Sequence, residues 1–322
     1  MKEHKKTYNW GIIGPGRIAR KFAAGLQLLP QARLYAVASR SYSRAKDFAD
    51  EFGFEKVYGS YTEMLEDKTL DVVYIATTNN LHCEHTLMCL EAGKAVLCEK
   101  PFASNASEVC SMIAKSREKG VFLMEALCTR FLPNMLNLKL QIEAGIIGKP
   151  VMLQCDFGFF RAFDPQDRVF APLLGGGSVP DIGIYPVFTA LYLFGKPIEI
   201  RTLSVPAPTG TDMTTAILMR HSGGELSMLS SSLAAQFENE ARVYGEKGQL
   251  KIPRQFSRTD RLMFVAPDGT ETPLAAGLDG NGFNYEAAEV MSCLDRNLIE
   301  SPSMSHSFSL DLIETLDGII EN

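Results

Sequence analysis

An amine and a carboxylate stand together where an apolar run of the sequence ends. The run Val96–Cys98 is followed directly by Glu99, Lys100 and Pro101. A lysine amine can hold or transfer a proton and can hydrogen-bond an oxygen atom of a bound molecule. Pro101 fixes its own φ angle and restricts Lys100 to extended geometry, so the strand stops there. Because parallel sheets bind ligands at the carboxyl ends of their strands, Lys100 is the first candidate site residue.

A second pair of reactive side chains lies much further along the chain. Asp181 and Tyr185 are four residues apart in a helical pattern that ends at Gly195. This spacing places both side chains on one helix face, where a carboxylate and a phenol can contact the same substrate hydroxyl. The alternative is an Asp that caps the helix and a Tyr that flanks the core. The glycines at 175–177 favour a site, because glycine permits the close approach of a ligand.

A glycine-rich turn precedes the first candidate in the sequence. An apolar strand at residues 8–13 leads into it, and a helical pattern follows. In this context the pattern G-x-G-x-x-A binds the pyrophosphate of a dinucleotide: the first glycine makes the turn and the second lets backbone approach the phosphate. A tight turn without a ligand is the alternative. The residues of the turn are Gly14, Pro15, Gly16, Arg17, Ile18 and Ala19.

The strand predicted over residues 33–38 ends in a hydroxyl and a guanidinium. Ser39 and Arg40 stand where dinucleotide-binding folds usually place an Asp or Glu for the adenosine ribose. These groups would instead bind a 2′-phosphate, and Arg44 could add a second charge. The sequence therefore predicts NADP in preference to NAD, with solvated surface arginines as the alternative.

Further polar side chains follow the strand predicted over residues 70–76. They lie in the same sheet layer as the glycine turn, so we expect them, with Glu99 and Lys100, to line the nicotinamide end of a cofactor groove. These residues are Thr77, Thr78, Asn79 and His82. His82 and His85 lie at helical spacing without a convergent third ligand, so no metal site is predicted.

Composition narrows the class of protein. The 322 residues are 46% hydrophobic, and the net charge is 32 − 38 = −6 without a basic block, which argues against nucleic acid as a partner. The seven cysteines form no C-x-x-C pair, which favours reduced thiols and a cytoplasmic location. No signal-peptide core and no run of about 18 apolar residues occurs, so no membrane association is predicted.

The pattern of elements changes about two-fifths of the way along the chain. Strands and helices alternate up to residue 127, which predicts a doubly wound parallel sheet. Short alternating strands follow, which predicts a second α/β domain over residues 128–322 with a large, mainly antiparallel sheet. The terminal helix predicted over 305–320 could pack back on the first domain. The strands predicted in the second domain are residues 151–157, 198–205, 214–220, 224–232, 240–245, 248–252 and 261–266.

With these pieces in place, the chain resembles the Gfo/Idh/MocA family of oxidoreductases. The run 125–131 and Tyr185 are most similar to the branch of dimeric dihydrodiol dehydrogenases and NADP-dependent xylose dehydrogenases. Cys128 replaces a tryptophan that the dihydrodiol branch usually has, so the substrate stays open among sugars, polyols and cyclic diols. The segments that carry the resemblance are residues 11–19, 76–82, 99–101 and 175–185.

The resemblance implies a Rossmann domain for NADP and a substrate domain whose open sheet forms a homodimer or a higher homo-oligomer. It also implies hydride transfer between the nicotinamide and a secondary alcohol or carbonyl carbon. Arg168 and Phe160 precede the helix of Asp181 and are candidates for contact with the substrate. Family members often bring an aromatic residue over the pocket from the last long helical region, which makes Tyr285 a third candidate.

Within that reaction, one proton must leave the substrate hydroxyl. Our hypothesis gives this proton to Tyr185, whose pKa of ~10 a neighbouring Lys100 ammonium would lower. Asp181 would orient the substrate or the lysine. The opposite division, with Lys100 as the proton carrier and Tyr185 as its helper, stays open.

Two other functions remain compatible with the sequence. The same fold could hold NADP(H) as a sensor that regulates a partner without turnover. It could also exchange hydride between two sugars through a tightly held cofactor.

Overall fold

The computed structural model describes residues 6–274 and 277–321, and these form two compact units. The first unit comprises residues 1–128 and 279–310, and the second comprises residues 129–278 and 311–322. The division after Cys128 lies next to the predicted boundary at residue 127. The return of residues 279–310 to the first unit was not predicted from the sequence.

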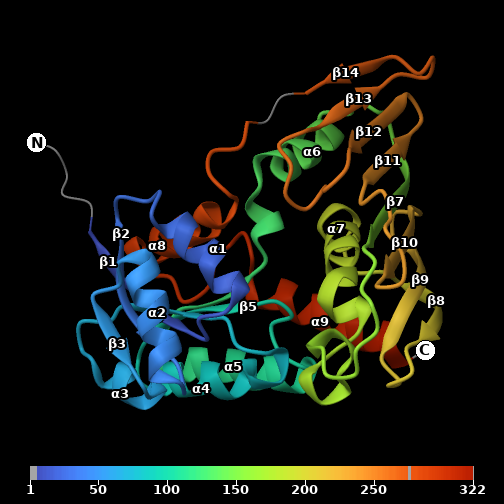
Figure 1. Ribbon diagram of the computed structural model, residues 1–322. Coiled ribbons are helices and arrows are strands. Elements are labelled where there is room, and N and C mark those ends of the chain that lie inside the picture. The colour runs from blue at the N-terminus through green and yellow to red at the C-terminus, as the bar shows by residue number, and fades with distance from the viewer. Residues whose placement is uncertain (1–5, 275–276, 322) are drawn as a thin grey trace, which may run out of the picture. The chain divides into compact units, whose positions relative to one another are not determined.

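The first unit contains a six-stranded parallel sheet in the order β3-β2-β1-β4-β5-β6 (Figure 1). The order reverses direction between β1 and β4, so the carboxyl ends of these two strands flank the crevice in which such sheets bind ligands. The doubly wound fold class is confirmed. The strands are β1 (Tyr8–Ile13), β2 (Ala32–Ala38), β3 (Lys56–Tyr58), β4 (Val72–Ile75), β5 (Ala95–Glu99) and β6 (Leu123–Ala126).

Helices cover both faces of this sheet, which explains why its central strands are apolar throughout. Figure 1 shows α4 and α5 side by side on one face, while α1 and α8 pack together on the other. Local signals fix the helix ends: Asn105 accepts a hydrogen bond from the Glu108 amide at the start of α5, and Gly120 ends it with φ +64°. The helices of this unit are α1 (Arg17–Leu26), α2 (Tyr42–Phe52), α3 (Tyr61–Glu66), α4 (His82–Glu91), α5 (Ala106–Lys119) and α8 (Phe283–Asp295).

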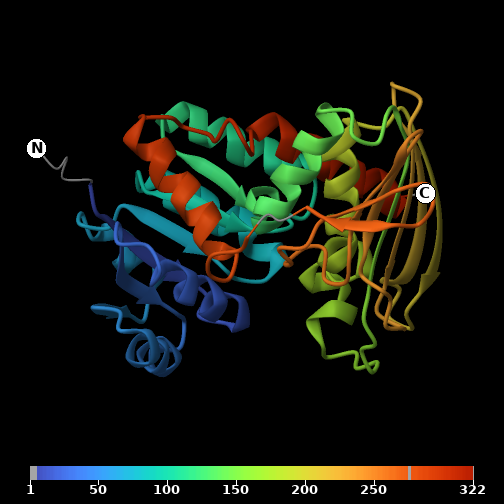
Figure 2. The ribbon, with the colours of Figure 1, turned by 90° about the horizontal axis from the view of Figure 1, so that it is seen from above.

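The second unit contains an eight-stranded sheet in the order β14-β13-β12-β11-β7-β10-β9-β8. Neighbouring strands are antiparallel except β7 and β10, which run parallel. The mainly antiparallel open sheet is confirmed (Figure 2). Its strands are β7 (Pro150–Gly158), β8 (Glu199–Pro206), β9 (Asp212–Arg220), β10 (Leu226–Ser232), β11 (Ala241–Gly245), β12 (Gly248–Ile252), β13 (Met263–Val265) and β14 (Glu271–Pro273).

Details of this unit differ from the sequence prediction, and strand β14 was not predicted at all. Strand β10 starts at Leu226 and not at residue 224, because Gly224 has φ +93° and closes a turn onto His221. Helix α6 (Pro133–Glu143) was not predicted, although Pro133 at its first position is a usual start signal. The other helices are α7 (Ile184–Phe194) and α9 (His306–Glu321), the second of which begins in the first unit.

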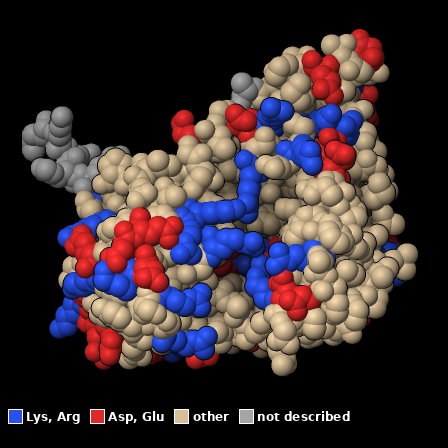
Figure 3. All heavy atoms as spheres, viewed as in Figure 1, with Lys and Arg blue, Asp and Glu red and all other residues tan. Residues whose placement is uncertain are grey.

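The surface and the thiols agree with an ordinary globular chain. Figure 3 shows acidic and basic side chains side by side over the region of α2 and α3, as expected for a chain without a basic block. All seven cysteines are free, and five of them are buried. Within the two described ranges, the longest apolar helices are too short to cross a bilayer.

Candidate active site

The glycine turn after β1 needs one of its glycines for its own geometry and the other for no internal contact. Gly14 has φ +85°, and a Cβ there would lie 2.9 Å from the backbone carbonyl of Ala76, so only glycine fits. Gly16 differs, because a Cβ there would meet only the Gly14 oxygen at 3.9 Å. Protein packing therefore does not explain Gly16, whereas close approach of a phosphate does. Gly16 caps α1 without a side-chain hydrogen bond, which leaves amide donors of the first turn available to an anion.

The end of β2 carries exposed positive charge. Ser39 is buried and its hydroxyl accepts a hydrogen bond from the Ser41 amide at 3.3 Å. Arg40 and Arg44 are both exposed. Burial chiefly lowers the pKa of His85, and the nearby charge of Arg40 lowers it further, which puts Arg40 near the start of α4. This strand end can hold a phosphate group.

His82 joins the loops that follow β4 and β5. It is fully buried, with Nδ1 2.8 Å from the Pro101 carbonyl oxygen and Nε2 3.2 Å from that of Thr77. Burial lowers its pKa to about 4. Thr77 also hydrogen-bonds the ring of His85 at 3.0 Å. Because its ring atoms contact protein carbonyls away from solvent, His82 can influence a bound cofactor only by holding these loops.

Lys100 follows β5 in half-buried surroundings, and its peptide bond to Pro101 is cis. Glu99 is buried, accepts a hydrogen bond from the Tyr74 hydroxyl, and accepts another from the Lys100 amide at 3.2 Å. Phe22 of α1 stacks on the Tyr74 ring with centroids 3.7 Å apart. Burial, with the charge of Glu99, raises the pKa of Tyr74 well above its ordinary value. Glu99 is therefore held mainly by protein groups.

Two further buried carboxyl groups lie in this unit, and sequence reasoning did not assign either to the site. Glu125 is the penultimate residue of β6, and its Oε1 accepts a hydrogen bond from the Phe102 amide at 3.1 Å. Glu286 lies on the buried face of α8, where burial and the charge of Glu99 raise its pKa well above the usual range. A carboxylate inside an apolar run, next to the strand of Lys100, was the available signal for Glu125.

In the second unit, Asp181 lies in a π-helical turn (Val179–Gly183) that continues into α7. Such turns are frequent at functional sites. Asp181 and Tyr185 are both buried, and Arg168 Nη2 forms an ion pair with Asp181 Oδ1 at 2.8 Å. The ring of Tyr185 packs against Phe157 with centroids 5.4 Å apart. The structure thus brings together Arg168 and Asp181, which the sequence assigned to separate roles.

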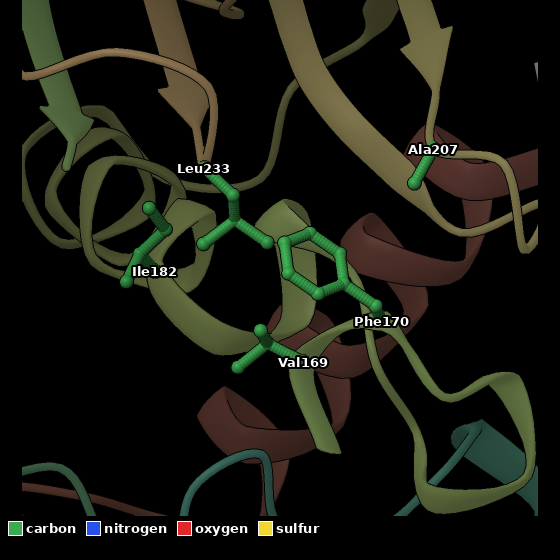
Figure 4. Close-up of a cluster of buried hydrophobic side chains, with 5 residues drawn as sticks. All are labelled: Val169, Phe170, Ile182, Ala207 and Leu233. Atoms are coloured by element: carbon green, nitrogen blue, oxygen red, sulfur yellow. The ribbon is translucent and has the colours of Figure 1, made fainter. Parts of the chain in front are cut away.

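A small apolar cluster holds the Arg168 segment against this turn. Figure 4 shows Val169, Phe170, Ile182 and Leu233 with their side chains directed toward one another, and Ala207 at the edge. All five are buried. Because Val169 follows Arg168 and Ile182 follows Asp181, packing of the cluster aligns the two charged side chains.

The remaining candidates lie on different segments. Phe160 follows β7 and is 69% exposed, so its ring is available for contact. Tyr285 lies in α8, where its hydroxyl accepts a hydrogen bond from the Asp279 amide at 2.8 Å. Among residues 6–274 and 277–321, His, Cys, Asp and Glu side chains form no group arranged to hold a metal ion.

Known proteins match this chain over nearly its full length. Residues 8–127 match a family described as an oxidoreductase family with an NAD-binding Rossmann fold, and residues 135–251 match the C-terminal domain of the same family. The chain is 38% identical to trans-1,2-dihydrobenzene-1,2-diol dehydrogenase of Mus musculus, over 96% of this chain and 94% of the relative. The Homo sapiens protein of that name is 37% identical, over 96% and 95%.

Solved structures agree in fold. A 3-ketoreductase from Actinomadura kijaniata, in complex with NADP and TDP-benzene, superimposes with a TM-score of 0.87 at 26% identity, covering 98% of this chain and 97% of that one. Aldose-aldose oxidoreductase from Caulobacter crescentus gives 0.90 at 24% identity with the same coverage. With two family models matched in order along the chain, this protein belongs to the Gfo/Idh/MocA family of oxidoreductases.

Proposed function

We propose that this protein transfers a hydride between NADP(H) and a secondary alcohol or carbonyl carbon of a small sugar, polyol or cyclic diol. In this proposal the first unit holds the cofactor and the second holds the substrate. The relatives named dihydrodiol dehydrogenases and the ketoreductase bound to NADP support this substrate class and cofactor.

One observation carries the proposal. Gly16 and Lys100 both lie at the carboxyl edge of the same parallel sheet, on strand ends that flank its switch point or adjoin it. The open space above Gly16 fits a pyrophosphate, and no internal contact requires a glycine there. The same edge therefore offers a cofactor cradle and an amine.

The preference for NADP rests on the end of β2. No carboxylate stands at residues 39–40, and two exposed guanidinium groups lie within one helical turn. Arg40 and Arg44 would pair with a 2′-phosphate, while the Ser39 hydroxyl could donate to it. A free ribose hydroxyl would gain much less from these groups.

The chain's own residues would orient the substrate and manage one proton. The cofactor, when bound, supplies or accepts the hydride. Tyr185 takes the hydroxyl proton of an alcohol, and the ammonium of Lys100 hydrogen-bonds the same oxygen and favours the phenolate. Asp181, held by Arg168, would orient the substrate. If Lys100 is instead the proton carrier, Tyr185 would stabilise the oxygen by donating its hydroxyl.

We also propose that two copies associate through the outer face of the second unit's sheet. Among the described residues of this unit, α7 covers one face and no helix covers the other (Figures 1 and 2). Leu203 is 82% exposed there, and Leu218 is 55% exposed on the neighbouring strand. A contiguous apolar face of this kind marks an interaction surface. The other exposed apolar residues that the strand register places on this face are Val205, Leu226 and Met228.

A location in the cytoplasm is part of the proposal. It is supported by seven free thiols, five of them buried, because such thiols persist in reducing compartments. Mass spectrometry of the protein from fractionated cells, with thiols alkylated at lysis, would test it; recovery in an oxidising compartment would contradict it.

A substrate panel tests the main proposal. Purified protein is mixed with NADP or NAD and a set of sugars, polyols and cyclic diols, and absorbance of the reduced nicotinamide is followed. We expect turnover with NADP at a higher kcat/KM than with NAD. Absence of turnover, with NADPH still bound, would favour a sensor. Cofactor that stays in the protein through purification, detected by mass analysis, would favour the sugar–sugar exchange.

A further inference from the structure

The Lys100–Phe102 segment is held by a side chain from the neighbouring strand. Strands β5 and β6 are parallel, with Cys98 opposite Glu125 and Glu99 opposite Ala126. Side chains alternate along a strand, so Glu125 lies on the sheet face opposite to Glu99. Its Oε1 accepts the Phe102 amide hydrogen bond at 3.1 Å. Backbone amides of the Lys100–Phe102 segment thus donate hydrogen bonds to two carboxyl groups, Glu99 and Glu125, which lie on opposite faces of the sheet.

Glu125 has a second carboxylate oxygen that its hydrogen bond from the Phe102 amide does not use. The residue is 2% exposed, and its Oε2 is buried without a hydrogen-bond partner among the described residues. A buried charge without a partner costs several kcal/mol, so such a group persists where it serves a purpose or stays protonated. One oxygen holding a loop amide therefore leaves a second oxygen that can respond to a nearby cation.

The groups around this carboxyl oppose one another. Burial raises the pKa of Glu125 to about 7, and the charge of Glu99 also raises it. Hydrogen bonds from the Ser309 hydroxyl and the Phe102 amide lower this pKa, as does the charge of Lys100. Cys98 of β5 is paired with Glu125 across the sheet. Burial chiefly raises the pKa of the Cys98 thiol, and the charge of Glu125 raises it further. Lys100 is the cation whose charge acts on this carboxyl. Ionisation of Glu125 therefore favours the ammonium form of Lys100 by the same coupling.

We propose that Glu125 is a positioning residue for Lys100: it fixes the Lys100–Phe102 segment through the Phe102 amide and, when ionised, keeps Lys100 protonated. The inference rests on the proposed function in giving Lys100 a role in the reaction. An ammonium can donate a hydrogen bond to the substrate oxygen, whereas a neutral amine is a weaker donor. Glu125 itself contacts neither substrate nor cofactor in this proposal.

The test measures the protonation of Lys100 directly. Trace acetic anhydride is added at a series of pH values, and mass spectrometry gives acetylation of Lys100 relative to exposed Lys68. The variants are Glu125→Gln and, as a matched control, Glu286→Gln. E125Q keeps an oxygen for the Phe102 amide and loses the charge. E286Q also replaces a buried carboxyl whose charged form burial disfavours, but this one lies on α8 and not on the strand next to Lys100.

We expect the pH of half-maximal Lys100 reactivity to fall by roughly one unit in E125Q and to stay at the wild-type value in E286Q. In turnover assays, the alkaline limb of kcat should shift in the same direction, with KM for NADPH unchanged. An identical Lys100 midpoint in E125Q and wild type would overturn the proposal. So would an equal shift in E286Q.

The test still gives an answer if E125Q does not fold, and also if the protein is inactive on every substrate. If E125Q does not fold, the wild-type curve decides, because the logarithm of the Lys100 labelling rate should rise less steeply around pH 7, where Glu125 ionises and favours the ammonium. A rise of constant steepness through that range contradicts the proposal, and an inflection there supports it. The labelling needs no turnover, so a shifted Lys100 midpoint in a protein inactive on every substrate would reject the proposed function and retain the role of Glu125.

Discussion

Two strand ends of the first unit carry charged side chains in different surroundings, one exposed to solvent and the other buried. At the end of β2, Arg40 and Arg44 are exposed. At the ends of β5 and β6, Glu99 and Glu125 are buried, and the half-buried Lys100 lies beside them. The exposed end can select among ligands by charge, and salt will screen that selection. The buried end changes the protonation of its own groups, because burial penalises charge.

This difference predicts where substitutions act. A change at the exposed end should alter binding of one cofactor and leave pH profiles intact. A change at the buried end should alter pH profiles or turnover and leave cofactor choice intact. The following substitutions test that division.

The largest effect is expected for Lys100→Met. Removal of a positioned acid/base group typically costs about 10²–10⁴-fold, so kcat should fall by that factor while NADPH binding changes little. Fluorescence titration of NADPH and steady-state kinetics measure the two quantities. Lys68→Met, which removes an exposed lysine, is the control. Wild-type turnover in K100M would remove Lys100 from the mechanism.

The pH dependence of stability tests the buried end. Burial raises the pKa of Glu125 to about 7, above its ordinary value of 4.5. The unfolded chain therefore ionises first, and stability from this group is full below pH 4.5 and is lost as pH rises to about 7. The loss is about 3 kcal/mol.

Urea unfolding at pH 4.5, 6 and 8 measures this loss of stability when the free energy of unfolding of E125Q is compared with that of wild type. E125Q should gain about 3 kcal/mol relative to wild type between the lowest and the highest pH. E286Q should also flatten the wild-type slope, because burial raises the pKa of Glu286 well above its ordinary value and that carboxyl too ionises first in the unfolded chain. A constant difference between E125Q and wild type would mean that Glu125 does not titrate there.

A smaller effect is expected for Arg40→Ala. Loss of a charge-assisted hydrogen bond to a phosphate costs about 1.5–3 kcal/mol, so NADPH should bind roughly 10–100-fold more weakly while NADH binding is unchanged. Arg20→Ala removes another exposed arginine of this unit, one that pairs with Glu51, and serves as the control. Equal losses for both cofactors would show that Arg40 does not read the 2′-phosphate.

The smallest effect on stability is expected for Arg168→Ala. The Arg168 side chain is 41% exposed, and such ion pairs contribute about 0–1 kcal/mol. Thermal unfolding should therefore change little, while KM for substrate rises because Asp181 loses its orientation. Arg161→Ala removes a similarly exposed partner, that of Asp167, and is the matched control. A loss of several kcal/mol in R168A alone would make the pair a structural one.

Much of the fold follows from local patterns. The strands predicted over residues 8–13, 33–38 and 70–76 agree with β1, β2 and β4 to within about two residues at each end, because apolar runs bounded by turn residues are local signals. The glycine turn was also predictable, since Gly14 must adopt a positive φ angle whatever lies around it. Arg40 and Arg44 could be placed because an exposed residue after a strand depends on few neighbours.

The buried contacts could not be predicted in this way. Glu125 meets Phe102 only because β6 pairs with β5 in one register. Glu286 approaches Glu99 only because residues 279–310 return to the first unit. His82 reads as a helix-start residue in the sequence, and its two carbonyl contacts come from loops on both sides. Each of these depends on pairing between segments that are distant in the chain.

That return of residues 279–310 also orders events during protein synthesis. Gly25 of α1 lies against Phe283 and Asn284, and the Leu123 amide at the start of β6 bonds to the Ile299 carbonyl at 3.0 Å. The ribosome releases the first 128 residues long before these partners exist. The cofactor-binding unit therefore completes its packing only after most of the second unit has emerged, and until then α1 and the edge of β6 stay uncovered on the nascent chain.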